Sequence, residues 1–222
     1  MKFDAVLFDC DGVLVDSEPI TNGVLRDMLE ELGWRLDLQT CMEIFVGKAV
    51  LDERARIEAE TGRPVTPEWM AEFRVRRNAA LEAQVGAIAG AVQAVAAVHA
   101  SAQGRIACAS GADRVKVEMQ LQKVGLWPYL QGRVFSGHEM PRSKPHPDVY
   151  LAAAQSLGVP AGRCAVVEDT ATGIAAGVAA GATVFAYAPA GQGDALRQAG
   201  AHHVFTHMDA LHACLLGADL RA

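Results

Sequence analysis

Short apolar segments alternate with helix-length patterns along most of this chain, and this alternation limits the fold more than any other feature. Five apolar segments predict buried strands, at residues 5–8, 105–109, 134–136, 164–167 and 183–187. Two of the helical patterns between them, 112–124 and 147–157, end next to Gly125 and Gly158, which suit helix C-caps. The alternation predicts an α/β fold with a doubly wound parallel sheet.

The stretch 17–85 interrupts this alternation. It carries amphipathic helical patterns, such as 21–32 and 67–81, and no strand pattern. We therefore expect a core domain formed by residues 1–16 and 86–222, and an inserted helical cap domain formed by residues 17–85. Since the insertion leaves the sheet after the first strand and returns before the second, we expect it to lie over the carboxyl end of the first strand as a lid.

Charge and hydropathy argue against some classes of binding partner for this chain. The formal net charge is −6 and no run of Lys or Arg occurs, which argues against nucleic acid or an anionic membrane as the main partner. No apolar run reaches the roughly 20 residues of a membrane helix, and the N-terminus shows no basic leader with a cleavage site. The composition is compatible with a monomer and leaves the oligomeric state open.

The cysteines are few and widely spaced. They number five, no two of them form a CxxC pair, and they stand at Cys10, Cys41, Cys108, Cys164 and Cys214. An odd, scattered set of cysteines is typical of reduced thiols. We therefore expect a cytoplasmic protein.

Two aspartates one residue apart follow the first predicted strand. Asp9 and Asp11 stand before Gly12, at a strand end where open α/β sheets bind ligands. The Asp-x-Asp-Gly pattern also occurs in surface turns and calcium loops, but residues 13–15 are apolar where a calcium loop needs further acidic ligands. Because two carboxylates this close repel each other, a divalent cation is expected to compensate them.

Three further polar pieces follow predicted strands or open a helix. Glu168 and Asp169 would add hard oxygen ligands, which Mg²⁺ prefers. Ser110 and Gly111 offer a hydroxyl and a backbone N–H to an anion. Lys144 lies in a proline-containing stretch that is not helical, and from there it could neutralise a phosphate. Taken singly, each piece is as readily a helix N-terminus, a turn or a solvated lysine.

In this order, the four pieces resemble the signature of the haloacid dehalogenase-like superfamily, and the resemblance covers essentially the whole chain. The helical insertion directly after the first motif is similar to the small cap of the phosphatase and phosphomutase branch. The resemblance implies a Rossmann-like core and a Mg²⁺-dependent phosphatase that acts on a small phosphorylated metabolite. Since dehalogenase members lack a second aspartate at the place of Asp11, a halide substrate is not expected.

The resemblance also implies roles for the site residues. Asp9 corresponds to a nucleophile that forms an aspartyl-phosphate, and Asp11 to the acid that protonates the leaving oxygen and then activates water. Mg²⁺ would be held by Asp9, the Asp11 carbonyl and Asp169, with Glu168 either binding the metal or standing behind its ligands. The groups expected to bind the phosphoryl oxygens are Ser110, Gly111, Lys144 and the backbone N–H groups of Cys10 and Asp11.

Substrate selection is expected in the inserted unit. Gly47 and Lys48 fall where relatives carry a loop that is directed at the substrate. Lys48, Arg76 and Arg77 are candidates for binding a second anionic or hydroxyl group, and solvated surface charges are the alternative interpretation of all three.

Further phrases, including Asp16-Ser17-Glu18-Pro19 and Phe205-Thr206-His207-Met208, resemble those of bacterial 6-phosphogluconate phosphatases. This resemblance implies a sugar phosphate or sugar-acid phosphate as substrate, with 6-phosphogluconate as one example. It does not select one metabolite, because the cap residues that decide specificity vary in such enzymes.

Two alternative functions remain on the same scaffold. One is a sugar phosphomutase similar to β-phosphoglucomutase, which would return the phosphoryl group to sugar instead of water. Thr21 stands where mutase relatives carry a histidine, and Lys48-Ala49-Val50 stands where they carry an arginine, so hydrolysis is favoured. The other is an idle binding protein, which is disfavoured because every residue that the chemistry needs is present.

Overall fold

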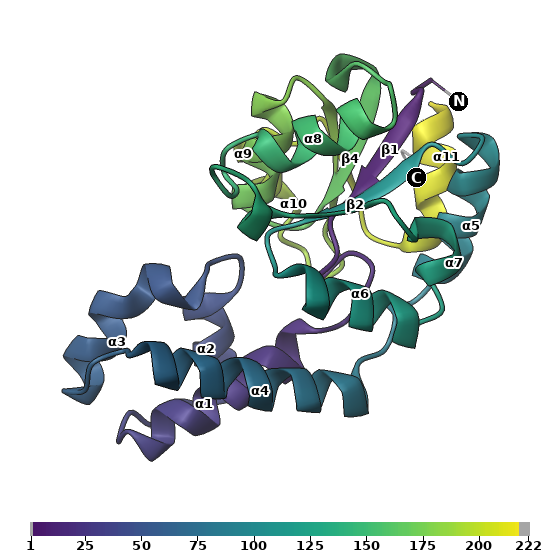
Figure 1. Ribbon diagram of the computed structural model, residues 1–222. Helices are drawn as coiled ribbons and strands as arrows, with labels where there is room; N and C mark the ends of the chain where they lie inside the picture. Colours follow the sequence, from purple (N-terminus) through teal and green to yellow (C-terminus); the bar gives the residue numbers. More distant parts are fainter. Residues whose placement is uncertain (1, 218–222) are drawn as a thin grey trace. The chain divides into compact units, whose positions relative to one another are not determined.

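The computed structural model describes residues 2–217 of the chain. The chain divides into two compact units, Met1–Val15 with Gly86–Ala222 and Asp16–Val85. Each unit has its own hydrophobic core. Figure 1 shows strands in the first unit only, and the second unit is drawn entirely as helices and their connections.

A parallel six-stranded sheet forms the centre of the first unit, with the strand order β3-β2-β1-β4-β5-β6. The strands are β1 (Ala5–Phe8), β2 (Ile106–Ser110), β3 (Val134–Ser136), β4 (Cys164–Glu168), β5 (Thr183–Tyr187) and β6 (His203–Phe205). The predicted α/β class and doubly wound sheet are thereby confirmed, since β1, β2 and β4 are buried along their whole length, as strands covered on both faces must be.

One strand was not predicted from the sequence. β6 pairs with β5 through His203 opposite Phe185, and His203 is exposed and stacks on the Phe185 ring with 4.6 Å between the ring centroids. The strand is only three residues long and lies at the sheet edge. The strand begins with the polar, exposed His203 and buries only Phe205, so its sequence shows no apolar pattern.

Helices cover the sheet on both faces (Figure 1). In the first unit they are α5 (Ala91–Ser101), α6 (Arg114–Lys123), α7 (Trp127–Leu130), α8 (Asp148–Ser156), α9 (Ala171–Ala179), α10 (Gly193–Gln198) and α11 (Leu211–Leu216), with 3₁₀ turns at Gly137–Glu139, Ala161–Arg163 and Met208–Ala210. The glycines expected after the helical patterns 112–124 and 147–157 do follow α6 and α8, and both have the left-handed backbone that suits glycine.

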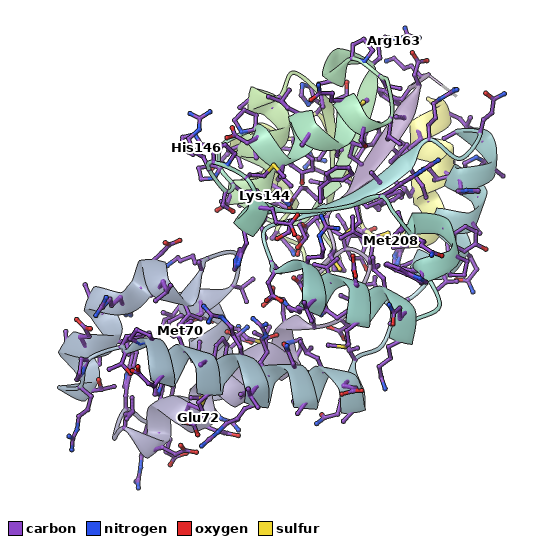
Figure 2. The ribbon with its side chains drawn as sticks, in the orientation of Figure 1. Met70, Glu72, Lys144, His146, Arg163 and Met208 are labelled. Carbon is purple, nitrogen blue, oxygen red and sulfur yellow. The ribbon has the colours of Figure 1, made fainter. Side chains whose placement is uncertain are left out.

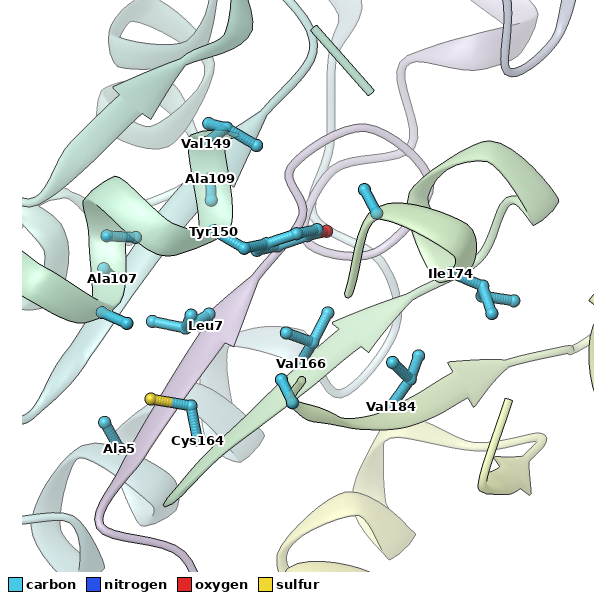
Figure 3. Close-up of a cluster of buried hydrophobic side chains, with 14 of the residues drawn as sticks. Ala5, Leu7, Ala107, Ala109, Val149, Tyr150, Cys164, Val166, Ile174 and Val184 are labelled. Carbon is cyan, nitrogen blue, oxygen red and sulfur yellow. The ribbon is translucent and has the colours of Figure 1, made fainter. Parts of the chain in front are cut away.

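One hydrophobic cluster of this unit lies between the sheet and α8 and α9. Leu7, Ala107 and Val166 point from neighbouring strands toward Tyr150 of α8 and Ile174 of α9, and all five side chains are buried (Figure 3). Alternate strand residues are needed on this face because the side-chain period of a strand is two. The packing holds α8 and α9 firmly against the sheet and fixes the loops at the carboxyl ends of its strands.

The second unit is a helical bundle. Its elements are α1 (Glu18–Glu31), α2 (Leu38–Phe45), a 3₁₀ turn (Val50–Glu53), α3 (Arg54–Thr61) and α4 (Pro67–Gln84). Its buried cluster joins Leu29 of α1, Phe45 of α2, Ile57 of α3 and Phe73 of α4. The expected helix 21–32 starts earlier, at Glu18, because Pro19 is favourable in the first turn.

The insertion leaves and re-enters the first unit at neighbouring points. Val15 forms an antiparallel bridge with Ala87, and the Ile88 N–H donates to the Leu14 carbonyl over 3.1 Å. Among residues 2–217, the structure contains no helix with the length and apolar character to cross a membrane.

Candidate active site

The carboxyl ends of β1, β2 and β4 bring the predicted site residues to one edge of the sheet. β1 lies between β2 and β4, and Phe8 is in register with both Cys108 and Val167. Asp9 therefore emerges next to the ends of both neighbours. The strand order changes direction at this point, which is where open α/β sheets form a ligand crevice.

The loop after β1 is a tight turn. Its Cys10 carbonyl accepts hydrogen bonds from the Leu14 and Val15 N–H groups, over 2.8 Å and 3.1 Å. Gly12 has φ +75°, a conformation that costs a residue with a Cβ on the order of 1–3 kcal/mol. The turn lets the backbone pass directly against the Asp169 carboxylate.

Three carboxylates gather at this edge. Side-chain oxygens of Asp9, Glu168 and Asp169 lie within 4.8 Å of one another. Hard carboxylate oxygens at this spacing are the donor set that Mg²⁺ prefers. The chemistry of the donors therefore fits the metal expected from the sequence.

Lys144 places its ammonium between two of these carboxylates. Its Nζ donates to Asp9 Oδ1 over 2.6 Å and to Glu168 Oε1 over 2.7 Å. The Lys144 side chain is only 8% exposed, and Figure 2 shows it directed inward, whereas His146 two residues later points outward. The sequence could not distinguish this lysine from a solvated one, and the structure places it inside the carboxylate cluster.

Burial sets the electrostatics of the cluster. It raises the pKa of Asp9 to about 7, and the charges of Glu168 and Asp11 add to this rise against the opposing charge of Lys144. Burial alone would lower the pKa of Lys144, but Asp9 and Glu168 together hold it well above its usual range. For Glu168, burial favours the neutral acid, yet the contact with Lys144 lowers its pKa.

Glu168 is held by hydrogen bonds on both carboxylate oxygens. Besides Lys144, its Oε1 accepts from the Tyr150 hydroxyl over 2.8 Å. Its Oε2 accepts from the Asp169 N–H over 3.0 Å, and from the N–H and the hydroxyl of Thr170 over 3.1 Å each. This set of bonds couples Glu168 to the position of Lys144 and to the turn that carries Asp169.

Sequence analysis did not identify Tyr150. It lies on the buried face of α8, and the Lys144 ammonium stands 4.7 Å from the centre of its ring. A buried tyrosine hydroxyl normally requires a hydrogen-bond partner. The need for a partner could have marked Tyr150 in the sequence as a residue with a buried hydrogen bond, but it could not have identified Glu168 as the acceptor.

Asp11 is contacted from α6. Its Oδ1 accepts a hydrogen bond from Lys116 Nζ over 2.8 Å and from Gln120 Nε2 over 3.1 Å. Sequence analysis identified neither residue, because polar residues in a helical pattern are normally assigned to the solvent-exposed face. The four-residue spacing, which puts them on one helix face, was the available signal.

Ser110 ends β2 at the same edge. Its side chain is 1% exposed, and its hydroxyl accepts from the Ala112 N–H over 3.0 Å. Ser136 Oγ donates to the Ala112 carbonyl over 2.6 Å, so the loop that starts with Gly111 is tied to β3. The phosphate-binding roles of Ser110, Gly111 and the Cys10 backbone stay predictions.

The remaining candidate residues, those expected to bind the substrate, belong to the helical unit. Lys48 follows Gly47 after α2, and its ammonium forms an ion pair with Glu53 over 2.7 Å. Arg76 forms ion pairs with two glutamates, Glu31 and Glu72. Within this unit these side chains have acidic partners of their own, and their role in substrate binding stays a prediction.

Comparison with known proteins agrees with this geometry. Residues 3–181 match the family model for haloacid dehalogenase-like hydrolases. The chain is 30% identical to the 6-phosphogluconate phosphatase of Escherichia coli over 83% of this chain and 82% of that protein. It is 28% identical to the fructose-1-phosphate phosphatase YqaB of E. coli, over 81% of this chain and 94% of that one.

A solved structure extends the similarity to nearly the full length. The HAD family hydrolase of Deinococcus radiodurans R1, crystallised with bound phosphate and sodium, is 37% identical with a TM-score of 0.80, over 98% of this chain and 96% of that one. The sheet topology, the strand-end carboxylates and the family match lead to one assignment. The chain belongs to the haloacid dehalogenase-like hydrolase family.

Proposed function

We propose that this protein is a Mg²⁺-dependent phosphatase that hydrolyses a small phosphorylated metabolite through an aspartyl-phosphate on Asp9. The main support is the placement of Asp9 at a strand end, hydrogen-bonded to the buried Lys144 and grouped with Glu168 and Asp169. The family and the phosphatase names of the relatives support a phosphoric monoester hydrolase.

The proposed reaction has two displacements. In the first, a carboxylate oxygen of Asp9 attacks phosphorus and the P–O bond to the leaving group breaks, while Asp11 donates a proton to the departing oxygen. In the second, Asp11 removes a proton from water as the water oxygen attacks phosphorus. The Asp9–phosphate bond then breaks, which releases inorganic phosphate, restores the carboxylate of Asp9 and leaves Asp11 protonated for the next cycle.

Charge compensation is the second part of the proposal. The residues that would hold Mg²⁺ are Asp9 and Asp169 with the Asp11 backbone carbonyl, and the bound ion would neutralise charge on the phosphoryl oxygens. Lys144 would bind the same oxygens, since its ammonium already contacts Asp9. Because Glu168 accepts five hydrogen bonds, we assign it to holding Lys144 and the 168–170 turn, behind the metal ligands.

We extend the proposal to the phosphate site and the substrate class. Ser110, Gly111 and the backbone N–H groups of Cys10 and Asp11 would complete the phosphoryl site. A sugar phosphate or sugar-acid phosphate is the proposed substrate class, on the names of the relatives. Gly47 and Lys48 of the helical unit are the proposed selectivity residues.

A reducing, cytoplasmic compartment is proposed from the free cysteines.

The direct test is release of inorganic phosphate. The purified protein would be incubated with Mg²⁺ and a generic aryl phosphate, and then with a panel of phosphorylated sugars, sugar acids and glycolytic intermediates that includes 6-phosphogluconate. We expect turnover of the aryl phosphate and a higher kcat/KM for one member of the panel. Absence of turnover with every ester would favour the idle binding protein.

The phosphomutase alternative needs its own assay. Incubation with β-glucose 1-phosphate and a trace of β-glucose 1,6-bisphosphate would be followed for glucose 6-phosphate and free phosphate together. Because Thr21 stands where mutase relatives carry a histidine, we expect water to be the usual acceptor and phosphate release to dominate. Isomerisation faster than phosphate release would overturn the hydrolase proposal.

A further inference from the structure

Two polar side chains of α6 converge on one oxygen of Asp11. Lys116 Nζ lies 2.8 Å and Gln120 Nε2 lies 3.1 Å from Asp11 Oδ1. Lys116 is 6% exposed and Gln120 is fully buried. The pair belongs to a different loop and helix from the cluster around Lys144, so Asp11 has an environment of its own within the site.

The position of the pair follows from the helix. Asp113 caps α6, because its side chain accepts a hydrogen bond from the Lys116 N–H over 3.0 Å. Residues four apart share a helix face, so Lys116 and Gln120 point the same way. Lys123 near the end of the same helix is exposed, which is the ordinary place for a helical lysine.

The Gln120 amide is oriented by a second contact. Its Oε1 accepts from the Cys10 thiol over 3.9 Å, which leaves the NH₂ group directed at Asp11. Cys10 lies between the two aspartates in sequence, so the same turn that carries Asp9 also orients the group that holds Asp11.

Burying a lysine and a glutamine beside one carboxylate is costly unless each finds a partner. A purely structural ion pair needs only one contact with Asp11. The arrangement has two donors on the same oxygen, one charged and one neutral, and this fixes the direction in which the carboxylate is held.

We propose that Lys116 and Gln120 are positioning residues for Asp11, which hold Oδ1 so that Oδ2 is the atom that exchanges the proton with the leaving oxygen and then with water. This inference rests on the proposed function. Asp11 acts on the substrate, and the two α6 residues act through it.

The dependence of the reaction on its leaving group tests this role. Lys116→Met keeps the length of the side chain and removes the donor. We would compare kcat/KM for the best alkyl phosphate of the panel, whose leaving oxygen needs a proton, with kcat/KM for 2,4-dinitrophenyl phosphate, whose leaving group departs without one. General acid help is typically worth 10²–10⁴-fold.

If the positioning role is correct, Lys116→Met lowers kcat/KM for the alkyl ester by about 10- to 100-fold, as part of that general acid help is lost. For the dinitrophenyl ester, kcat/KM should fall by less than about threefold, because the dinitrophenolate leaving group needs little protonation by the acid. Gln120→Leu should also lower the ratio of kcat/KM for the alkyl ester to kcat/KM for the dinitrophenyl ester. Lys123→Met, which makes the same change on an exposed site of the same helix, should leave the ratio as in the unchanged protein.

Equal losses for both esters in both variants would show a structural role only and overturn the proposal, as would no loss for either ester. Thermal unfolding identifies a variant that does not fold. If Lys116→Met is such a variant, the ratio in Gln120→Leu decides alone. Failure of the unchanged protein to release phosphate from either ester would instead overturn the proposed function.

Discussion

The backbone of Gly12 lies directly against the carboxylate of Asp169. A Cβ placed on residue 12 would stand 2.0 Å from Asp169 Oδ2 and 2.8 Å from its Cγ. This contact joins the loop after β1 to the loop after β4, the two loops that carry the proposed metal ligands.

Gly12→Ala should therefore damage the site more than the fold. The variant must accept a left-handed backbone, which costs about 1–3 kcal/mol, and it must also displace the Asp169 carboxylate. We expect loss of most phosphatase activity and a weaker dependence of thermal stability on Mg²⁺. Gly125→Ala is the matched control, because Gly125 has φ +76° and nothing within 4 Å of its added Cβ. Equal activity in the two variants would contradict this interpretation.

Asp9→Asn should abolish turnover while the protein stays folded. An amide has nearly the shape of the carboxylate and cannot act as the nucleophile. Asp11→Asn should instead lower activity by about 10²–10⁴-fold, the usual value of general acid–base help. Phosphate release and thermal unfolding measure both effects, and activity near that of the unchanged protein in Asp9→Asn would rule out the proposed mechanism.

The pKa of Asp9 predicts an unusual pH dependence of stability in the metal-free protein. Burial raises this pKa from 3.8 to about 7, so from about pH 4 to about pH 7 the folded protein holds a proton that the unfolded chain has released. Stability should therefore fall as the pH rises through this range, by at most about 4 kcal/mol from this residue.

The measurement compares unfolding of the unchanged protein and Asp9→Asn in a chelator from pH 4 to pH 8. Subtracting the two curves removes the groups that do not interact with Asp9. Glu168 does interact with it, and its lowered pKa contributes stability of the opposite trend, present above its unfolded pKa and lost below its folded one. The part of the difference that falls as the pH rises therefore belongs to Asp9. A difference that does not change with pH would show that Asp9 keeps its ordinary pKa.

Mg²⁺ should be required for activity and should stabilise the protein. Asp9 and Asp169 are close enough to repel each other when both are charged, and a divalent cation removes this repulsion. A chelator should abolish phosphate release, and added Mg²⁺ should restore it. Ca²⁺ should bind and support little activity, because it is larger and looser in its coordination. Full activity in excess chelator would show that the carboxylate cluster has another role.

The strands at the centre of the sheet could be predicted from the sequence for a physical reason. β1 and β4 are buried on both faces and read as continuous apolar segments. The acidic residues that follow them could be predicted as a group, since the ends of parallel strands meet at one edge. β6 could not be predicted, because it begins with the polar, exposed His203 and buries only Phe205.

The residues that support the site could not be identified in the same way. Tyr150 and Lys116 lie on helices, where a one-dimensional pattern gives the face of a residue but not the group that it meets across space. Their partners are 18 and 105 residues away in the chain. Only the packing of α8 and α6 against the sheet brings them to Glu168 and Asp11.

The pairing of Val15 with Ala87 has a consequence for how this chain can be altered. The segments on either side of Asp16–Val85 are already joined by backbone contacts that belong to the sheet-containing unit. A short glycine-containing loop could therefore replace Asp16–Val85 without stretching the chain. Such a shortened protein should still fold, and the same junction should accept helical units from other family members, so that the proposed role of this unit in substrate selection can be tested by exchanging one continuous gene segment.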